Sequence, residues 1–314
     1  MKIIISPAKK MNIRTDEPVE FTEPVYLKKA ECLWNTLKEK DFQTLQKLWK
    51  CNEKIARQNW YRLQNQNFSS RLTPAVLAYE GIQYQYMAPS VFTENQWEYA
   101  QKNLRILSGL YGILRPMDGV IPYRLEMQTR LETVSNSRKK RDLYDFWEED
   151  IYRELVKEER IILNLASKEY SKTVAPYVRE DVRYITCIFG EWAEGRVKVK
   201  GTQAKIARGE MVRWLSENQI EEVEKVKEFQ GGYRYEPVHS TASEMVFIKE
   251  KGGFAEVKNE NEIREIIEYY ASQRNAAEQE NIVSMLREIQ EVEGYIPVDA
   301  QEMAAEKAGS KACN

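Results

Sequence analysis

Histidine and closely spaced cysteines are nearly absent from this chain of 314 residues. His239 is its single histidine, and Cys32, Cys51, Cys187 and Cys313 form no C-x-x-C pair. Non-haem iron centres commonly bind through two or more histidines, and zinc or iron–sulfur sites use closely spaced cysteines. We therefore expect no metal and no cofactor. A site made of carboxylates alone stays open, although no paired spacing indicates one.

Long apolar runs are missing as well. The first one, Ile3–Ile5, is far shorter than the roughly 20 residues of a membrane helix or the apolar core of a signal peptide. Hydrophobic residues make up 42% of the chain and charged residues 31%, which is typical of a globular protein with a core. The sequence therefore predicts a cytoplasmic protein that does not contact a membrane.

A strong excess of positive charge is also lacking, because the formal net charge is −2. The charge is distributed unevenly. Residues 258–314 carry six Lys/Arg and twelve Asp/Glu, so residues 1–257 have a net charge of +4. A slightly basic body with an acidic tail permits a nucleic-acid partner without requiring one.

The densest group of unusual residues lies between Trp97 and Arg130. Apolar residues recur at helical spacing from Trp97 to Leu107, which predicts an amphipathic helix. Residues 108–112, SGLYG, follow with two glycines three apart, and a second apolar piece ends at Arg115. This pattern is similar to a helix-hairpin-helix, whose turn exposes backbone N–H groups to a phosphate. A hairpin that only turns the chain is the alternative interpretation.

Four blocks of sequence together resemble the YaaA peroxide-stress family. They are MKIIISPAKKM at the start, SGLYGILRPMDGVIPYRLEM at 108–127, ILNLASKEYSK at 162–172 and KIARGEMVRW at 205–214. Their order and spacing fit, and the resemblance covers about residues 1–249. It implies a compact fold that carries a helix-hairpin-helix. It also implies a DNA-binding protein of the oxidative-stress response, which limits damage from peroxide and unincorporated iron.

Short apolar strands that end in polar clusters are a second recurring pattern. Lys2–Ile5 and Arg160–Leu165 are predicted to be buried strands, and they lead into the polar segments Ser6–Lys10 and Asn164–Lys172. Loops at the carboxyl ends of parallel strands are where α/β proteins bind ligands. We therefore predict an α/β protein (mixed α+β), in which helices surround a mixed sheet of short strands.

A long helix is predicted over Lys205–Phe229, with further strands over Val182–Phe189, Arg196–Lys200 and Glu244–Lys249. Lys205, Arg208 and Arg213 fall within one broad arc of this helix. Basic residues near a helix N-terminus oppose the helix dipole. An anionic partner explains them better than helix stability does.

We expect these segments to converge on one basic cleft that binds DNA. Lysines and arginines would neutralise phosphates, the glycine turn would hold one phosphate, and tyrosines would stack on exposed bases. The predicted nucleic-acid-binding residues are Ser6, Lys9, Lys10, Gly109, Tyr111, Gly112, Arg115, Tyr123, Arg124, Tyr170, Lys172, Lys205, Arg208 and Arg213.

An enzyme that acts on a nucleotide or a nucleic-acid base is the second hypothesis. Binding by charge alone does not need Asp118, Glu126 and Glu169 beside the arginines. Carboxylates near DNA are unfavourable unless they pair with Arg/Lys or transfer protons. These three residues are therefore candidate catalytic groups, and the alternative is that they only orient arginines through salt bridges.

The composition changes from Ile263 onward. We predict a domain over 1–257 and a helical extension over 258–314, whose part from Ile263 is dispensable for the domain's activity and able to dock another protein. Residues 284–309, SMLREIQEVEGYIPVDAQEMAAEKAG, resemble the helical start of the thioredoxin-like ferredoxin subunit of NADH dehydrogenases. The cysteines that bind the cluster in that family lie further on and have no counterpart here.

Overall fold

The computed structural model describes residues 1–13, 21–69, 72–135, 138–193 and 195–250, with the backbone of two short strands at 254–256 and 295–297. The chain groups into two compact units. The first consists of Met1–Ile188, Gly201–Phe229 and Glu236–Val246, and the second of Phe189–Lys200, Gln230–Tyr235 and Phe247–Asn314. The predicted boundary near residue 257 stays a prediction, and the predicted helical extension lies almost wholly outside the described residues.

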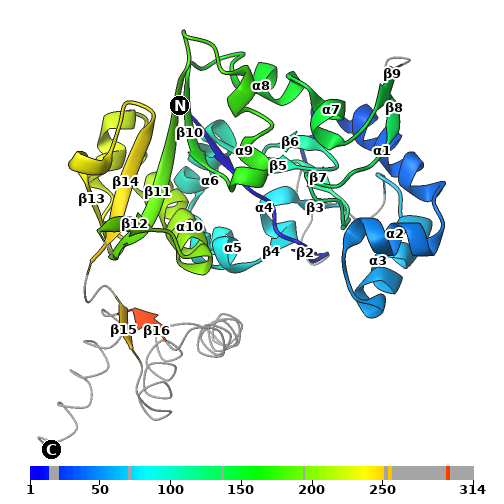
Figure 1. Cartoon of the computed structure of the whole chain (residues 1–314), viewed down its shortest axis with the longest axis horizontal. Coiled ribbons are helices and arrows are strands. Elements are labelled where there is room, and N and C mark those ends of the chain that lie inside the picture. Colours follow the sequence, from blue (N-terminus) through cyan, green and yellow to red (C-terminus); the bar gives the residue numbers. More distant parts are fainter. Residues whose placement is uncertain are drawn as a thin grey trace, which may run out of the picture. The chain divides into compact units, whose positions relative to one another are not determined.

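A sheet with a parallel core organises the first unit (Figure 1). β1 (Lys2–Ile5) pairs in parallel with β5 (Leu104–Ser108) on one side and with β10 (Ile161–Leu165) on the other. β11 (Arg183–Ala193) continues the parallel core beside β10. β1 is buried along its whole length, which explains its run of isoleucines. The predicted α/β class and the strands predicted at β1, β10 and β11 are confirmed.

The order of these strands creates a topological switch point. The chain leaves β1 towards β5, crosses back over the sheet to β10, and then moves outward to β11. The connections after β1 and after β10 therefore diverge between two adjacent parallel strands. Ligands of open α/β sheets bind outside the carboxyl ends of the strands at such a point.

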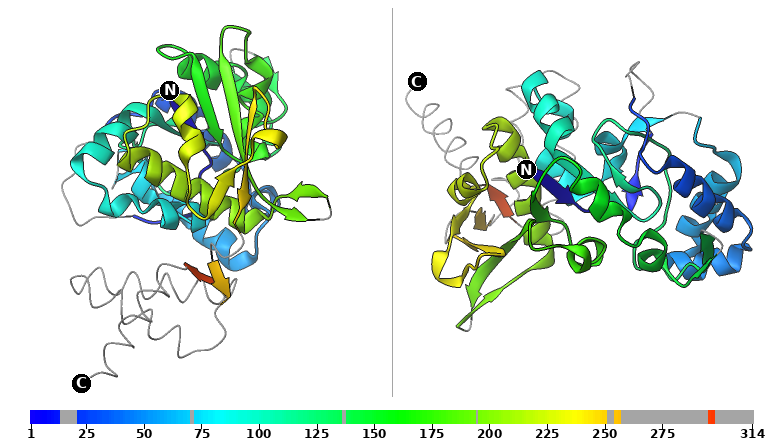
Figure 2. Two further views of the ribbon diagram at one scale, coloured as in Figure 1. Left: turned by 90° about the vertical axis from the view of Figure 1, so that its left-hand side faces the viewer. Right: turned by 90° about the horizontal axis from the view of Figure 1, so that it is seen from above.

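Helices and short two-stranded ladders complete the first unit. α6 packs on β1 and β5, α10 packs on α5 and α6, and α1, α2 and α3 gather in one group (Figure 2). The helices are α1 (Leu27–Lys38), α2 (Phe42–Trp49), α3 (Glu53–Asn65), α4 (Ala75–Ala78), α5 (Ile82–Met87), α6 (Glu94–Asn103), α7 (Leu143–Trp147), α8 (Asp150–Leu155), α9 (Lys168–Ser171) and α10 (Gly201–Glu217). The ladders pair β2 (Lys10–Met11) with β4 (Tyr79–Glu80), β3 (Thr73–Pro74) with β7 (Gly119–Val120), and β8 (Thr133–Ser135) with β9 (Arg138–Lys140).

The central stretch differs from its prediction. α6 ends at Asn103, and the chain continues from Leu104 as β5 because this segment pairs with β1. The two glycines, Gly109 and Gly112, then turn the chain into β6 (Gly112–Leu114), which is antiparallel to β5. The structure therefore does not confirm the expected helix-hairpin-helix, since a β-hairpin occupies this place. Sheet pairing outweighed the helical spacing of the apolar residues.

The long helix predicted over Lys205–Phe229 is wrong at both ends. α10 begins earlier, at Gly201, and ends at Glu217. Gln219 adopts a positive φ of 51°, which is incompatible with a continuing helix, and a 3₁₀ segment follows at Val223–Glu228. The charged residues of this region are therefore divided between two elements.

The second unit contains the distal parts of two strands. The end of β11 forms an antiparallel hairpin with β12 (Arg196–Lys198), and β13 (Tyr233–Tyr235) pairs with β14 (Glu244–Lys249) at its distal end. The rings of Phe189 and Phe247 stack at 5.3 Å in its core. β15 (Phe254–Glu256) pairs with β16 (Tyr295–Pro297), so a strand occupies three residues of the segment predicted to be helical.

The close packing of Gly109 predicts a large effect of a single methyl group. A Cβ at Gly109 would lie 2.3 Å from the carbonyl oxygen of Leu125, which is backbone and cannot easily move. We expect Gly109→Ala to lower the free energy of unfolding in urea by about 1–3 kcal/mol. Gly201→Ala is the matched control, because no atom lies within 4 Å of its added Cβ. Equal stability of the two variants would contradict this packing.

Candidate functional site

Two serines meet at the switch point of the parallel sheet. Ser6 directly follows β1, and Ser167 lies two residues after β10. The Ser6 hydroxyl donates to the Ser167 hydroxyl at 3.1 Å, and the Ser167 N–H donates to the Ser6 oxygen at 2.8 Å. The hydroxyl of Tyr84, on α5, donates to the Ser6 carbonyl at 2.9 Å. The polar ends of both strands are therefore joined where a ligand would bind.

A charged loop lies against this point. Arg124 and Glu126 form an ion pair at 3.2 Å, and their side chains are only 12% and 13% exposed. Lys9, from the loop after β1, reaches the same oxygen of Glu126 at 3.5 Å. Arg124 also donates to the carbonyl of Trp49 at 3.3 Å, which fixes its orientation. Glu126 thus faces two cations at a largely water-excluded position.

Glu169, at the start of α9, is a second carboxyl group of the same cluster. Its Oε1 atom accepts a hydrogen bond from the backbone N–H of Gln128 at 3.2 Å. Burial raises the pKa of Glu169 above its ordinary value, and the negative charge of Glu126 raises it further. Two carboxyl groups therefore lie within electrostatic reach of each other in different surroundings. This arrangement is typical of acid–base pairs in enzymes. We call Lys9, Arg124, Glu126 and Glu169, with Ser6 and Ser167, the carboxyl-edge cluster.

A chain of buried hydroxyl groups begins at the end of β5. The hydroxyls of Tyr79 and Tyr123 lie 2.7 Å apart, and that of Tyr123 lies 2.7 Å from the hydroxyl of Ser108. The Ser108 oxygen in turn accepts the N–H of Tyr111. Burial raises the pKa of Tyr123 to about 12, so this phenol stays protonated at neutral pH. The chain satisfies polar groups in the core and holds the residue-123 loop on β5.

The tyrosines and glycines predicted to contact nucleic acid are buried. Tyr111 is fully buried, with its hydroxyl accepting the N–H of Ile121, and Tyr123 and Tyr170 are 7% and 6% exposed. Gly109 contacts the Leu125 carbonyl, and the space beside Gly112 is filled by the Trp147 ring. In this arrangement none of the three tyrosines presents an open face to a base, and the glycine turn contacts protein.

Asp118 and Arg115 form a separate clamp. The fully buried Asp118 carboxylate accepts hydrogen bonds from Thr22 Oγ1 at 2.6 Å, from the Arg115 N–H at 2.8 Å and from Arg115 Nε at 3.0 Å. Burial raises the pKa of Asp118 above its ordinary value. Arg115 lines a cavity together with Lys2 at the amino end of β1, not with Ser6 at the carboxyl end. Asp118 therefore orients an arginine outside the carboxyl-edge cluster.

The other lysines and arginines that were predicted to bind nucleic acid differ in exposure and in their ion-pair partners. Lys10 pairs with Glu80, and Arg213 pairs with Glu217 one turn further along α10. Arg208 is largely withdrawn from water, which lowers the pKa of its guanidinium, and it faces the buried Cys187. Lys172 and Lys205 are exposed. The structure thus brings together Ser6, Lys9, Arg124, Glu126 and Glu169, and it places Arg115 apart from them.

Several residues in or beside the cluster were not among the predicted binding residues. Ser167 lies in the polar segment predicted after the second strand, although only Ser6 was predicted to bind. Tyr79 and Gln128 act through a hydroxyl and a backbone N–H, for which no sequence pattern exists. Cys51 lies close enough to Arg124 and Glu126 for their charges to affect its pKa, which burial raises. Within the described ranges, no group of three or more His, Cys, Asp and Glu side chains is placed to hold a metal.

The raised pKa of Glu169 predicts a pH-dependent stabilisation by Glu169→Gln. A raised folded-state pKa means that the folded protein loses stability as the pH rises through the window between the unfolded and folded values. Glutamine cannot ionise, so Glu169→Gln should raise the melting temperature relative to the wild type by more at pH 8 than near pH 4. Melting temperatures at both pH values test this. Glu31→Gln, on the exposed side of α1, should show equal shifts at both. An equal shift for Glu169→Gln would refute the prediction.

Asp118→Asn should destabilise the first unit. An amide can replace only some of the hydrogen bonds that the carboxylate accepts from Thr22 and Arg115, and it turns an N–H donor towards another donor. We expect a loss of about 1–3 kcal/mol in the free energy of unfolding, measured with urea. Asp41→Asn is the control, because Asp41 is an exposed N-cap of α2 and asparagine caps equally well. Wild-type stability of Asp118→Asn would argue against the clamp.

Comparison with known proteins identifies the family. The profile described as "Peroxide stress protein YaaA" matches residues 1–239. A UPF0246 protein of Desulfitobacterium hafniense is 51% identical over 250 residues, which are 79% of this chain and 98% of that protein. UPF0246 proteins of Agathobacter rectalis and Pediococcus pentosaceus are 51% and 49% identical over 248 and 250 residues, with the same shares covered. This chain therefore belongs to the YaaA peroxide-stress family.

Proposed function

We propose that this protein serves the response to peroxide by acting on a nucleotide or a nucleic-acid base at the carboxyl-edge cluster. The description of its family supports the link to peroxide stress. The proposal that the protein is an enzyme rests on Glu126 and Glu169, two carboxyl groups that lie near each other at the switch point and have different neighbours. In a site that only attracts phosphate, two carboxyl groups held side by side would repel the ligand.

The two glutamates suit different roles in proton transfer. Glu169 holds its proton to higher pH than an ordinary glutamate, because it is buried and close to Glu126. It can therefore donate a proton to a leaving or acceptor atom as a general acid. Glu126, which faces Arg124 and Lys9, is the proposed proton acceptor. The Ser167 hydroxyl accepts a hydrogen bond from Ser6, so its own proton can be donated to a polar ligand beside this pair.

Exposed lysines around the cluster support a nucleic-acid or nucleotide ligand. Lys168 and Lys172 belong to or directly follow α9, which begins at the switch point, and Lys9 lies on the neighbouring loop. The ammonium groups of Lys168 and Lys172 are exposed and can contact phosphates while a base approaches the glutamates, whereas Lys9 also pairs with Glu126. DNA binding without chemistry is the second candidate function, and the same exposed lysines favour it. Neither function uses a helix-hairpin-helix.

One experiment separates the two functions. Nucleotides, single-stranded DNA and duplexes with intact or oxidised bases are incubated with the protein, and products are analysed by mass spectrometry. We expect Glu169→Gln and Glu126→Gln to abolish product formation while DNA affinity, measured by fluorescence anisotropy, changes less than about tenfold. Products that form equally with the wild type and both variants would refute the acid–base roles.

The lysines should control affinity and its salt dependence. Lys172→Gln should weaken binding to all sequences and reduce the slope of log affinity against log salt by about 0.7–0.9. Lys157→Gln removes an equally exposed lysine that pairs with Glu154 and should change neither quantity. Salt-dependent binding without any product would leave DNA binding as the function. Absence of both binding and product would overturn the whole proposal.

A further inference from the structure

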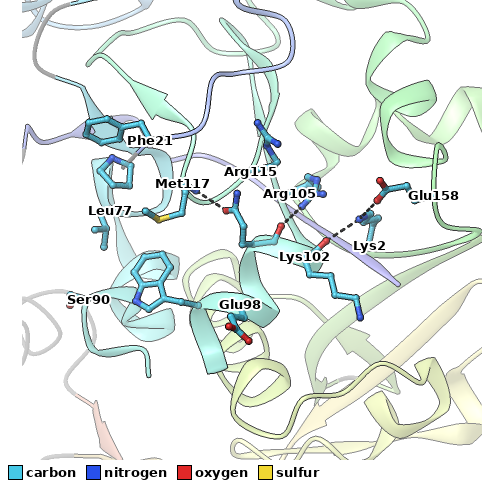
Figure 3. Close-up of a pocket in the computed structure, with 13 residues that line it drawn as sticks. Lys2, Phe21, Leu77, Ser90, Glu98, Lys102, Arg105, Arg115, Met117 and Glu158 are labelled. Carbon is cyan, nitrogen blue, oxygen red and sulfur yellow. Dashed lines mark hydrogen bonds and ion pairs between the residues drawn. The ribbon is translucent and has the colours of Figure 1, made fainter. Parts of the chain in front are cut away.

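A second candidate site lies at the opposite edge of the same strands. A cavity of about 1050 Å³ opens at the amino ends of β1 and β5, and it is drawn in Figure 3. Lys2 begins β1, whereas Ser6 follows it, so about 13 Å of extended strand separate this cavity from the carboxyl-edge cluster. Its volume is at the upper end of the range for small-molecule sites. Nothing in the proposed function uses it.

The two ends of the cavity differ in chemistry. Phe21, Leu77 and Met117 lie towards one end, whereas Lys2 and Arg105 lie towards the other (Figure 3). The indole of Trp97 and the side chain of Pro74 also line the wall. The cavity can therefore accommodate a molecule with one apolar, ring-shaped end and one charged end.

Arg105 is the cation with the least compensation in this cavity. Its Nη1 atom donates to the carbonyls of Gln101 at 3.0 Å and Leu104 at 2.7 Å. Within the described part of the chain, no carboxylate lies at ion-pair distance from its guanidinium. These two backbone contacts orient the group and leave other N–H donors available, because guanidinium carries five.

Lys2 places a second positive charge nearby. Its side chain is only 6% exposed, and its ammonium donates to the carbonyl of Lys102 at 2.9 Å and to Glu158 at 3.3 Å. Glu158 is 78% exposed, so water weakens this ion pair. Burial lowers the pKa of both Lys2 and Arg105, and the charge of Arg105 lowers the pKa of Lys2 further.

Apart from Glu158, the carboxylates whose charges reach these two cations pair with other groups: Asp118 with Arg115, Glu154 with Lys157, and Glu159 with the N-terminal amine. Arg115 and Lys102 also line the cavity, and they pair with Asp118 and Glu221 respectively. Glu98 lies near Trp97 on α6, away from the Lys2 and Arg105 end (Figure 3). Two partly buried cations held side by side destabilise each other, and an anion between them would relieve this repulsion.

We propose that this cavity binds a small organic anion with a planar aromatic body. The carboxylate or phosphate of the ligand accepts hydrogen bonds from Arg105 and Lys2, and its ring lies against Trp97, Leu77 and Phe21. Arginine recognises carboxylate and phosphate with paired N–H groups, which gives the charged end its selectivity. The apolar end adds affinity through ring burial.

Calorimetric titration of the full chain tests this site with two anions and their neutral counterparts. AMP and 2-naphthoate are the anions, and adenosine and 2-naphthol lack the charge. We expect at least one anion to bind more tightly than about 1 mM, with its neutral counterpart at least tenfold weaker. Failure of both anions to bind, or equal binding of the neutral molecules, would overturn the proposal.

Three variants locate the binding. Arg105→Gln should weaken the anion at least tenfold, as expected for the loss of a charged hydrogen bond. Leu77→Trp fills the apolar end without altering charge and should also abolish binding. This second variant keeps the test valid if Arg105→Gln does not fold. Arg57→Gln is the matched control, because Arg57 is an exposed arginine on α3 that pairs with Glu53. Unchanged affinity in both cavity variants would place the ligand elsewhere.

The outcomes are independent of the proposed function. Glu169→Gln and Glu126→Gln should bind the aromatic anion as the wild type does, because both residues belong to the carboxyl edge. If these variants lose the anion while Arg105→Gln keeps it, the ligand occupies the carboxyl-edge cluster and the cavity proposal fails. Loss of catalysis alone, with calorimetric binding intact, would leave it standing.

Discussion

The parallel pairing of β1 with β5 on one side and β10 on the other is the constraint on which this structure depends. β1 has only four residues, all buried, so its position is set by its two neighbours and by α6 above it. The connections after β1 and β10 then diverge, which joins Ser6 to Ser167 at the carboxyl edge. At the amino edge the same pairing places Lys2 beside the start of β5, where Arg105 lies.

The sequence predicted those features that depend on local pattern. The isoleucines of β1 and the apolar run of β10 predict buried strands, and their polar continuations predict Ser6, Lys9 and Glu169 as site residues. The structure places these three residues in the carboxyl-edge cluster, and their role as site residues stays a prediction. Asp41 is of a residue type that favours the N-cap position, and it accepts a hydrogen bond from the N–H of Thr44 at the start of α2. In each case a short segment contains the information.

The sequence could not predict features that depend on distant partners. Residues from Leu104 to Leu107 fit a helix by spacing, but the edge of β1 makes them a strand. Tyrosine is a residue type that stacks on bases, but Tyr111 and Tyr123 are buried in the core. The Tyr111 hydroxyl accepts the N–H of Ile121, and the Tyr123 hydroxyl bonds to those of Tyr79 and Ser108. The ion pairs Arg115–Asp118 and Arg124–Glu126 are local in sequence, but the fold places one pair at each edge of the sheet. The sequence showed the charges, whereas their distribution between the two edges depends on the fold.

The scarcity of histidine constrains the chemistry that this chain can perform. An unperturbed histidine titrates near neutral pH, and the single one here, His239, lies in the 3₁₀ turn Pro237–His239. The acid–base catalysis that we propose would then use a group whose pKa is displaced towards that range. Burial and the adjacent charge of Glu126 displace the pKa of Glu169 in this direction. Arg124 and Lys9 pair with Glu126, and the backbone N–H of Gln128 donates to Glu169. These contacts offset the burial of the two glutamates and the repulsion between them.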